Sequence, residues 1–212
     1  MFITFEGIEG SGKTTLLRGV AQSLRANGRD VVETREPGGT PIGDRIRAIF
    51  LDRTLRIAPL AEALLLNASR QHLIAEVIEP ALRAGRTVLC DRFVDSTLAY
   101  QGYGRGLDLT MLSRLSEAAT SGRVADVTFF VDIPVAVSRE RVARRELDDG
   151  HPQDRLDQED DAFHERVRAG YLELAKADKK RIRVLDGTLA ERQLLAKALD
   201  FLRQAQDRLT SV

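Results

Sequence analysis

The start of the chain joins a short apolar run to a glycine-rich turn and then to a helical pattern. Residues 2–6 are largely apolar, and the spacing Gly7-x4-Gly12-Lys13-Thr14 follows at once. Glycines allow backbone angles that are closed to other residues, so successive N–H groups can point at one anion at the N-terminus of the following helix. Lys13 adds a positive charge for terminal phosphates, and the Thr14 hydroxyl can ligate Mg²⁺. The sequence therefore predicts a phosphate-binding P-loop rather than a chance glycine-rich turn.

Length and composition exclude several other classes of protein. The 212 residues fit a single domain, 1–212, with a core large enough to stand alone. Basic and acidic residues number 32 each, so no net charge favours nucleic acid or a membrane as partner. The only cysteine, Cys90, has apolar neighbours and cannot form an internal disulfide, which predicts a buried thiol in a reducing cytoplasm. No segment has the pattern of a signal peptide or approaches the ~18 apolar residues of a membrane span, so neither secretion nor insertion is expected.

Short β-branched runs alternate with longer amphipathic runs along the chain. Strands are predicted at 2–6, 30–34, 87–91, 127–132 and 182–185. Helices are predicted at 13–27, 58–82, 109–121, 134–145, 159–178 and 189–208. This alternation predicts an α/β fold, a doubly wound five-stranded parallel sheet with flanking helices and with ligands at the carboxyl ends of the strands.

Three stretches hold more chemistry than simple connectors need. Residues 34–40 follow the second strand and contain the turn sequence Pro37-Gly38-Gly39, and residues 91–106 follow the third with an acid, an arginine, hydroxyls, an aromatic ring and an amide. Residues 139–168 hold seven arginines, no lysine and ten acidic residues. Arginine without lysine favours forked recognition of phosphate oxygens, and pairing with neighbouring acids on a wet surface is the alternative for about half of these arginines.

These stretches make the chain resemble the bacterial thymidylate kinases. The resemblance rests on Phe5-Glu-Gly-x-Glu-Gly-x-Gly-Lys-Thr-Thr15, on Arg35-Glu-Pro-Gly-Gly-Thr40, on Asp91-Arg92 followed by Ser96-Thr97-x-Ala99-Tyr100-Gln101-Gly102, and more loosely on Asp154-Arg-Leu-Asp-Gln-Glu159. It implies transfer of the γ-phosphate of ATP to dTMP, giving dTDP and ADP for dTTP biosynthesis. It also implies a nucleoside-monophosphate kinase fold with a P-loop at 7–14, an acceptor-binding region at about 35–75 and a mobile lid at about 142–158, and a homodimer.

Carried onto matching positions, the resemblance implies a role for each of several residues. The nucleotide would bind at Gly7, Ile8, Glu9, Gly10, Ser11, Gly12, Lys13, Thr14 and Thr15. The acceptor would bind at Glu9, Pro37, Leu66, Arg70, Arg92, Ser96, Thr97, Tyr100 and Gln101. Mg²⁺ would lie at Thr14 and Asp91, and catalysis would depend on Lys13, Arg92, Glu9, Arg144, Arg145 and Arg155.

Two positions of this chain qualify that assignment. Family members carry a transition-state arginine either in the P-loop or in the lid, and the variable P-loop positions 8–11 hold no basic residue here, which points to the lid. An aromatic residue often precedes the base-reading arginine by one helical turn, whereas this chain has Leu66 there, so either Leu66 contacts the base or another residue supplies the ring. For Arg70, the alternative to base reading is a surface ion pair with an acid such as Glu76.

Two other functions stay open from the sequence. One is a P-loop kinase for a different nucleoside monophosphate or for a deoxynucleoside, which a substrate panel would distinguish. The other is a nucleotide-switched binding module of the GTPase type. The chain lacks the guanine-reading Asn-Lys-x-Asp motif, and an arginine-rich lid has no role in such a switch.

Overall fold

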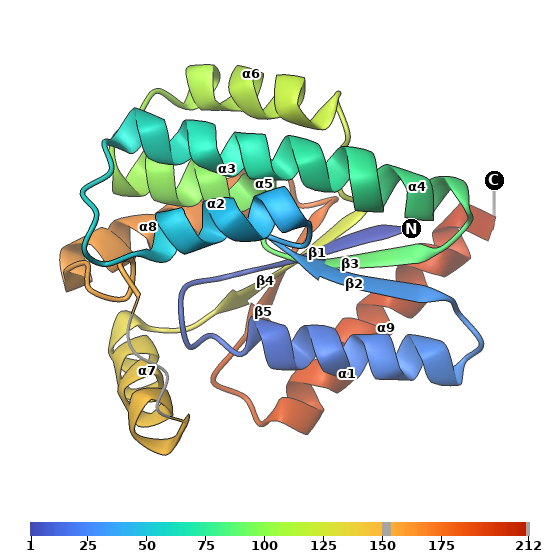
Figure 1. Ribbon diagram of the computed structural model, residues 1–212. Coiled ribbons are helices and arrows are strands. Elements are labelled where there is room, and N and C mark those ends of the chain that lie inside the picture. Colours follow the sequence, from blue (N-terminus) through green and yellow to red (C-terminus); the bar gives the residue numbers. More distant parts are fainter. Residues whose placement is uncertain (150–153, 211–212) are drawn as a thin grey trace.

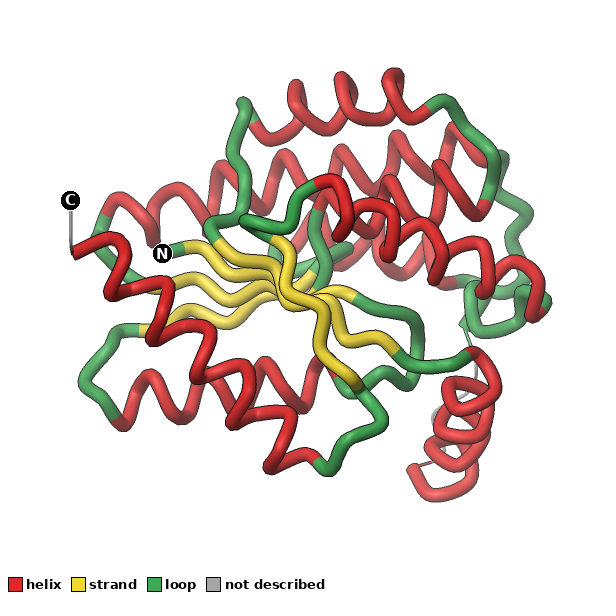
Figure 2. Tube along the Cα trace, turned by 180° about the vertical axis from the view of Figure 1, so that it is seen from behind, coloured by secondary structure: helices red, strands yellow, loops and turns green. Residues whose placement is uncertain are grey.

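The core of the molecule is one parallel sheet with helices on both faces (Figures 1 and 2). The computed structural model describes residues 1–149 and 154–210. The strands are β1 (Phe2–Glu6), β2 (Val31–Arg35), β3 (Thr87–Asp91), β4 (Val127–Asp132) and β5 (Ile182–Asp186). All neighbouring strands pair in parallel in the order β2-β3-β1-β4-β5, which confirms the predicted five-stranded parallel sheet.

Helices cover the sheet in two layers. They are α1 (Lys13–Ala26), α2 (Pro41–Leu51), α3 (Pro59–Leu73), α4 (Glu79–Arg83), α5 (Val94–Thr97), α6 (Leu109–Thr120), α7 (Val135–Asp149), α8 (Asp161–Ala177) and α9 (Glu191–Thr210), with π-helical turns η1 (Ile74–Ile78) and η2 (Leu98–Gly104). α1 and α9 pack against one face, and α3, α5 and α8 lie on the other (Figure 1).

The central strand shows why the chain folds in this way. Side chains of a strand alternate between its two faces, and all five residues of β1 are buried. Ile3 and Phe5 pack with α1 and α9, whereas Phe2 packs with the helical layer on the opposite face. Such two-sided burial is typical of parallel strands covered by crossover helices. Cys90 is a buried free thiol in β3, as its apolar neighbours predicted.

The helix predicted over 58–82 is present but changes its geometry on the way. α3 runs into the π-helical turn η1 and then into α4, whose second residue is Pro80. Proline has no N–H to donate to the preceding turn, and a π-turn is one of the ways in which a continuous helix adapts to such an irregularity.

Two helical segments lie outside the predicted set. α2 has clear start signals, since Thr40 accepts a hydrogen bond from Gly43 N at 3.0 Å and Pro41 occupies the first turn. Residues 94–104 carry Gly102 and Gly104, which disfavour a helix. A Cβ on Gly104 would lie 2.7 Å from the Phe163 ring in α8, and one on Gly102 would lie 2.4 Å from Leu109 in α6, so the two glycines allow close packing with two different helices.

The parallel arrangement brings four connecting segments to one edge of the sheet. The P-loop follows β1, Glu36 follows β2, Arg92 follows β3, and α7 follows β4. Hydrogen bonds from Arg92 N to Phe5 O and from Glu36 N to Asp91 O, both 2.9 Å, tie these connections together. No helix in the described parts of the chain is long and apolar enough to cross a membrane.

Candidate active site

The loop between β1 and α1 has the backbone that the P-loop prediction requires. Gly7, Gly10 and Gly12 have φ values of 146°, 68° and 92°, and Gly12 precedes the first residue of α1, Lys13. A Cβ at Gly7 would lie 2.6 Å from the carbonyl oxygen of Val131, so only glycine fits beside β4. Two of the predicted nucleotide-binding residues, Ile8 and Ser11, are buried and shape the loop from within.

A cavity of about 260 Å³ opens beside this loop. The residues lining it that the sequence predicted for the site are Glu9, Gly10, Lys13, Thr14, Pro37, Asp91, Arg92 and Arg145. Further lining residues had no site role among the sequence-based assignments, although most lie in the quoted motifs: they are Arg35, Glu36, Arg47, Asp154 and Asp157. We call this the phosphoryl cavity. It joins residues from the ends of β1, β2 and β3 with the segment around 154–157.

The charges in the phosphoryl cavity favour an anionic ligand. Burial and the neighbouring guanidinium of Arg92 both lower the pKa of Lys13. Burial raises the pKa of Glu9, but Arg92 and Lys13 outweigh that effect and lower it. Lys13 and Arg92, both partly buried, thus lie close to Glu9, and phosphate groups bound at the P-loop would place further negative charge beside these two cations.

Arg92 is held in place by several hydroxyls and one carboxylate. Its guanidinium donates to Glu9 Oε1 at 2.7 Å, Tyr100 OH at 3.1 Å and Ser96 Oγ at 3.2 Å. Its φ of 72° lies in the left-handed region, which costs a residue other than glycine of order 1–3 kcal/mol and is typical of functional sites. Although burial lowers the pKa of Arg92, Tyr100 and Glu9 raise it well above its ordinary value. Arg92 is thus a fixed, permanently charged donor.

Thr14 and Asp91 meet at the edge of the same cavity. The Thr14 hydroxyl donates to Asp91 Oδ2 at 2.5 Å. Mg²⁺ is held in kinase sites by one or two protein oxygens, phosphate oxygens and water. A hydroxyl and a carboxylate beside a phosphate-binding loop fit that requirement, so the two residues remain our predicted metal ligands.

A second, smaller cavity of about 30 Å³ is lined by the residues predicted to bind the acceptor except Glu9, which lines the phosphoryl cavity. Pro37, Leu66, Arg70, Arg92, Ser96, Thr97, Tyr100 and Gln101 all line it. We call it the acceptor cavity. Sequence analysis missed Glu36, Phe50 and Phe93, which line it as well. Phe50 and Phe93 therefore place aromatic rings at the cavity, although the position where an aromatic residue was expected holds Leu66.

Arg70 is buried, with 1% of its surface exposed, so the alternative of a surface ion pair with Glu76 is wrong. Its acidic partner is Glu36, whose Oε2 accepts from Arg70 Nε at 2.8 Å. Further bonds run to Thr97 Oγ1 and to the Phe93 carbonyl, both at 3.0 Å. Burial raises the pKa of Glu36 more than Arg70 lowers it. The partner was missed because the loop between Thr34 and Thr40 carries no sequence sign of which helix it will face.

The three predicted lid arginines lie in different surroundings. Arg145 lines the phosphoryl cavity and lies 3.6 Å from Asp157 Oδ2. Arg155 faces the acceptor side, where it pairs with Glu62 Oε1 at 2.5 Å and donates to the Phe50 carbonyl at 3.0 Å. Arg144 is exposed and pairs with Glu140 on its own helix. Residues 150–153 of the predicted lid lie outside the described residues.

A third cavity, of about 200 Å³, lies on the other side of the P-loop. The predicted residues Ser11, Gly12 and Thr15 line it, together with Arg141 and Gly187, which the sequence did not identify. Arg141 Nη1 also donates to the Gly10 carbonyl at 3.2 Å. The P-loop therefore separates two cavities and belongs to the wall of both. Gln101, at the acceptor cavity, donates to Glu62 Oε2 at 3.0 Å.

This arrangement defines a class: a P-loop phosphotransferase with separate cavities for a nucleotide and for a small acceptor. The family model for thymidylate kinase matches residues 5–198. The thymidylate kinase of Deinococcus radiodurans is 50% identical over 197 residues, covering 93% of each chain, and that of Citrifermentans bemidjiense is 49% identical over 210 residues, covering 98% of this chain and 93% of the relative. The solved thymidylate kinase of Ehrlichia chaffeensis superposes with a TM-score of 0.76 at 33% identity, covering 95% of this chain and 98% of that one. The chain belongs to the thymidylate kinase family and is a nucleoside-monophosphate kinase.

Proposed function

We propose that this chain transfers the γ-phosphate of ATP to dTMP and releases dTDP and ADP. The observation that carries the proposal is a shared wall: Glu36, Pro37 and Arg92 line both the phosphoryl cavity and the acceptor cavity. A monophosphate whose base lies in the acceptor cavity would thus present its phosphate at Arg92, facing the P-loop. Supply of dTDP for dTTP synthesis is the purpose that the family membership supports.

Each part of the proposed site has a distinct role in the transfer. Lys13 and the P-loop amides bind the β- and γ-phosphates, and Arg92 binds the acceptor phosphate. Thr14 and Asp91 would hold Mg²⁺, which would supply positive charge beside the phosphates of ATP. Phosphoryl transfer needs alignment and charge stabilisation more than covalent chemistry, which this set of residues supplies.

The adenine of ATP is proposed to occupy the third cavity. Phosphates at the P-loop would leave the base on the side where Arg141 and the segment around Gly187 meet. The guanidinium of Arg141 is fixed by the Gly10 carbonyl and offers a flat, charged surface for a ring. Thr15 and Ser11 line the path between the base and the phosphates.

Thymine would be recognised by donors on one side and rings on the other. Hydrogen bonds to Glu36, Asn67, Phe93 and Thr97 use four of the five N–H groups of Arg70. Among the described residues, this leaves one N–H for the carbonyl at C4 of the base. Thr97 can donate or accept at N3, and Phe50 offers an aromatic face beside Leu66.

The proposal includes a lid, a dimer and a cytoplasmic location. The lid is expected at about 142–158, and its described parts, 142–149 and 154–158, would cover the phosphoryl cavity and exclude water when ligands are bound. Exposed apolar side chains gather on α2, α3 and α6, which lie together on one side of the molecule (Figure 1). They are Ile42, Ile49, Leu60, Leu64, Leu109 and Met111. A two-fold interface would bury these side chains. Light scattering tests this: we expect wild type to have the mass of a dimer and Leu64→Glu to have the mass of a monomer.

A coupled ADP-release assay tests the proposed activity. Purified protein is given ATP and Mg²⁺ with dTMP, dUMP, dCMP, dGMP or AMP in turn. We expect the highest kcat/KM for dTMP, a clear loss for dCMP because its C4 amino group faces donors, and failure of the purines on size. A higher kcat/KM for any other acceptor would contradict the assignment.

A further inference from the structure

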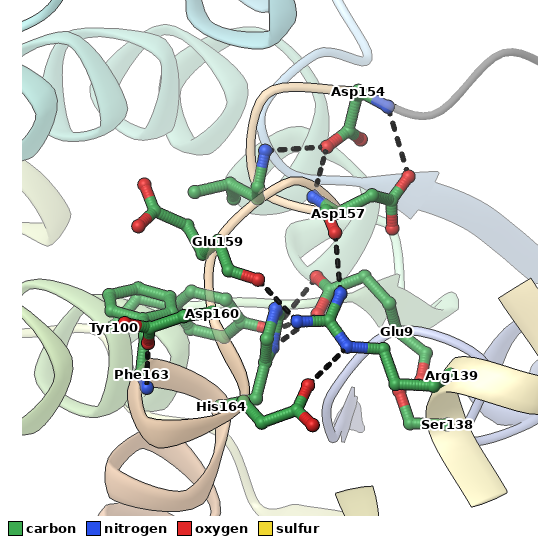
Figure 3. Close-up of polar contacts among 12 residues, drawn as sticks. Glu9, Tyr100, Ser138, Arg139, Asp154, Asp157, Glu159, Asp160, Phe163 and His164 are labelled. Carbon is green, nitrogen blue, oxygen red and sulfur yellow. Dashed lines mark hydrogen bonds and ion pairs between the residues drawn. The ribbon is translucent and has the colours of Figure 1, made fainter. Parts of the chain in front are cut away.

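Arg139, in the first part of α7, makes three bonds to one returning segment of the chain. Its Nε donates to Asp161 Oδ1 at 2.7 Å, its Nη1 to the Asp157 carbonyl at 2.6 Å, and its Nη2 to the Glu159 carbonyl. Figure 3 shows the guanidinium between these backbone groups and the side chain of Glu9 beyond them. Arg139 was not among the residues that the sequence predicted for the site.

The segment from 154 to 160 is not helical, and side chains from several elements hold it: Glu159 pairs with Arg105 at 2.6 Å and Arg155 pairs with Glu62 at 2.5 Å. Within the segment, Asp157 N donates to Asp154 Oδ1 and Asp154 N donates to Asp157 Oδ2, each at 3.0 Å, and Glu159 N donates to the Leu156 carbonyl at 3.2 Å. The carbonyls of Asp157 and Glu159 point away from that turn. A guanidinium spreads its donors over three nitrogens in a fixed plane, so Arg139 can meet two carbonyls and a carboxylate that lie apart from one another.

The same helix also binds the P-loop. Ser138 Oγ donates to the Glu9 carbonyl at 2.7 Å, and a Cβ on Gly10 would lie 3.0 Å from the Ser138 carbonyl. Neighbouring residues of α7 therefore contact two segments: Ser138 contacts the P-loop, and Arg139 contacts the segment at 157–161. The relative position of those two segments is set by a single turn of helix.

The returning segment brings acidic and basic groups to the phosphoryl cavity. Asp154 and Asp157 line it, and Asp157 is 3.6 Å from Arg145. Burial raises the pKa of Asp157 to about 6, with the charge of Asp154 adding to the effect. Just beyond the segment, in α8, His164 Nδ1 lies 3.6 Å from Glu9 Oε2. Arg139 itself lines none of the described cavities.

We propose that Arg139 is a positioning residue for phosphoryl transfer, which docks residues 157–161 against α7 and so fixes them relative to the P-loop. The inference rests on the proposed kinase function, because the groups that it positions line the phosphoryl cavity. It assigns no contact between Arg139 and a substrate. Its effect is on alignment, for which a displacement of about 1 Å costs up to about 100-fold in rate.

Steady-state kinetics test this role through the split between kcat and KM. In Arg139→Ala, we expect kcat to fall roughly 10- to 100-fold while KM for ATP, whose base lies on the other side of the P-loop, stays nearly constant. Arg139→Lys keeps the charge but carries its donors on one nitrogen, which cannot span acceptors met by three separate nitrogens, so its kcat should be intermediate. Added guanidinium ion, at concentrations far below those that unfold proteins, should restore part of the kcat of Arg139→Ala and none of that of Arg139→Lys, where the site is filled.

Hydrogen exchange provides a measurement that needs no acceptor, so a wrong role for Arg139 can be distinguished from a wrong substrate. Amides of 154–165 should exchange faster in Arg139→Ala, with those of α1 unchanged. The control is Arg203→Ala, which removes an exposed arginine paired with Asp200 and should alter neither kcat nor exchange near the site. The proposal is overturned if Arg139→Ala keeps wild-type kcat and exchange. It is equally overturned if the Tm of Arg139→Ala falls together with its activity and added guanidinium ion restores none of the kcat.

Discussion

At the scale of single residues, the site is defined by two cations, Lys13 and Arg92, that lie partly buried beside the P-loop. Lys13 and Arg92 lie in the phosphoryl cavity with Glu9 between them, and the pKa of Lys13 is lowered by burial and by Arg92. Such a cluster is stabilised when phosphate groups enter it. The charge that binds the ligand is then also present where charge develops during transfer.

Lys13→Ala should therefore nearly abolish catalysis and leave the fold intact. The loss of one preorganised donor at a developing charge costs on the order of 10²–10³ in kcat. Circular dichroism and thermal unfolding should be close to wild type, because the helix that begins at Lys13 packs through Leu16, Leu17 and Val20. A folded variant with near-wild-type kcat would contradict the role of the P-loop.

Arg70→Ala should weaken the choice of base. The variant removes a donor that faces the acceptor cavity and leaves Glu36 buried without its ion-pair partner. The dTMP-to-dCMP ratio of kcat/KM should fall by one to two decades, since an unpaired buried group costs about 1–3 kcal/mol. Because stability should fall too, the ratio between substrates on the folded protein is the quantity to measure. An unchanged ratio would show that other residues read the base.

At the scale of elements, the connections that follow the strands each contribute one part of the site. The connection after β4 is α7, which contributes the charged group of Arg145. Of the lid arginines, Arg145 lines the phosphoryl cavity, whereas Arg144 pairs with Glu140 on the exposed face of α7. Arg145→Ala should therefore lower kcat more than Arg144→Ala does, with KM for dTMP changed less than kcat. Equal, small effects in both variants would contradict a transition-state role for these two lid residues. Arg35 and Arg47 would then be the next candidates, because both line the same cavity.

The sequence predicted the elements well where a repeating apolar pattern set them. Each strand and each long helix was found within a few residues, because two-sided burial and amphipathic spacing leave a local signal. Residues 94–104 were missed because their helix depends on contacts with α8 rather than on local propensity. In the site, local motifs pointed to Lys13 and Arg92. Glu36 lies in a quoted motif but its partner Arg70 could not be read from it, and no motif marks Phe50 or Arg139, whose contacts are distant in the sequence.

At the scale of the whole molecule, stability should depend on the ionisation of one buried carboxyl. Burial and the charge of Asp95 raise the pKa of Glu6, in the central strand, to about 7. In the unfolded chain Glu6 ionises near its ordinary value, so between about pH 4.5 and 7 the folded state holds the extra proton. The free energy of unfolding should therefore fall as the pH rises through this window.

Glu6→Gln isolates that contribution. Its amide stays neutral at every pH, and the hydroxyls of Ser96 and Tyr171, which donate to Glu6, can turn to accept. Relative to wild type, the variant should lose less stability between pH 5 and 8, by up to about 3 kcal/mol in urea unfolding. Asp157 titrates in both proteins and cancels in the difference. If the free energy of unfolding changes with pH in the same way in wild type and in Glu6→Gln, Glu6 is ionised across the whole range and the prediction is wrong.

The central claim is that one phosphoryl group passes from ATP, at the P-loop, to a thymidine monophosphate bound across Arg92. The most direct test is to follow the label from [γ-³²P]ATP with Mg²⁺ and dTMP by thin-layer chromatography. The account predicts label in dTDP, which appears only with dTMP present and is nearly absent in Lys13→Ala. Label that stays in ATP or is released as inorganic phosphate at the same rate with or without dTMP would contradict it.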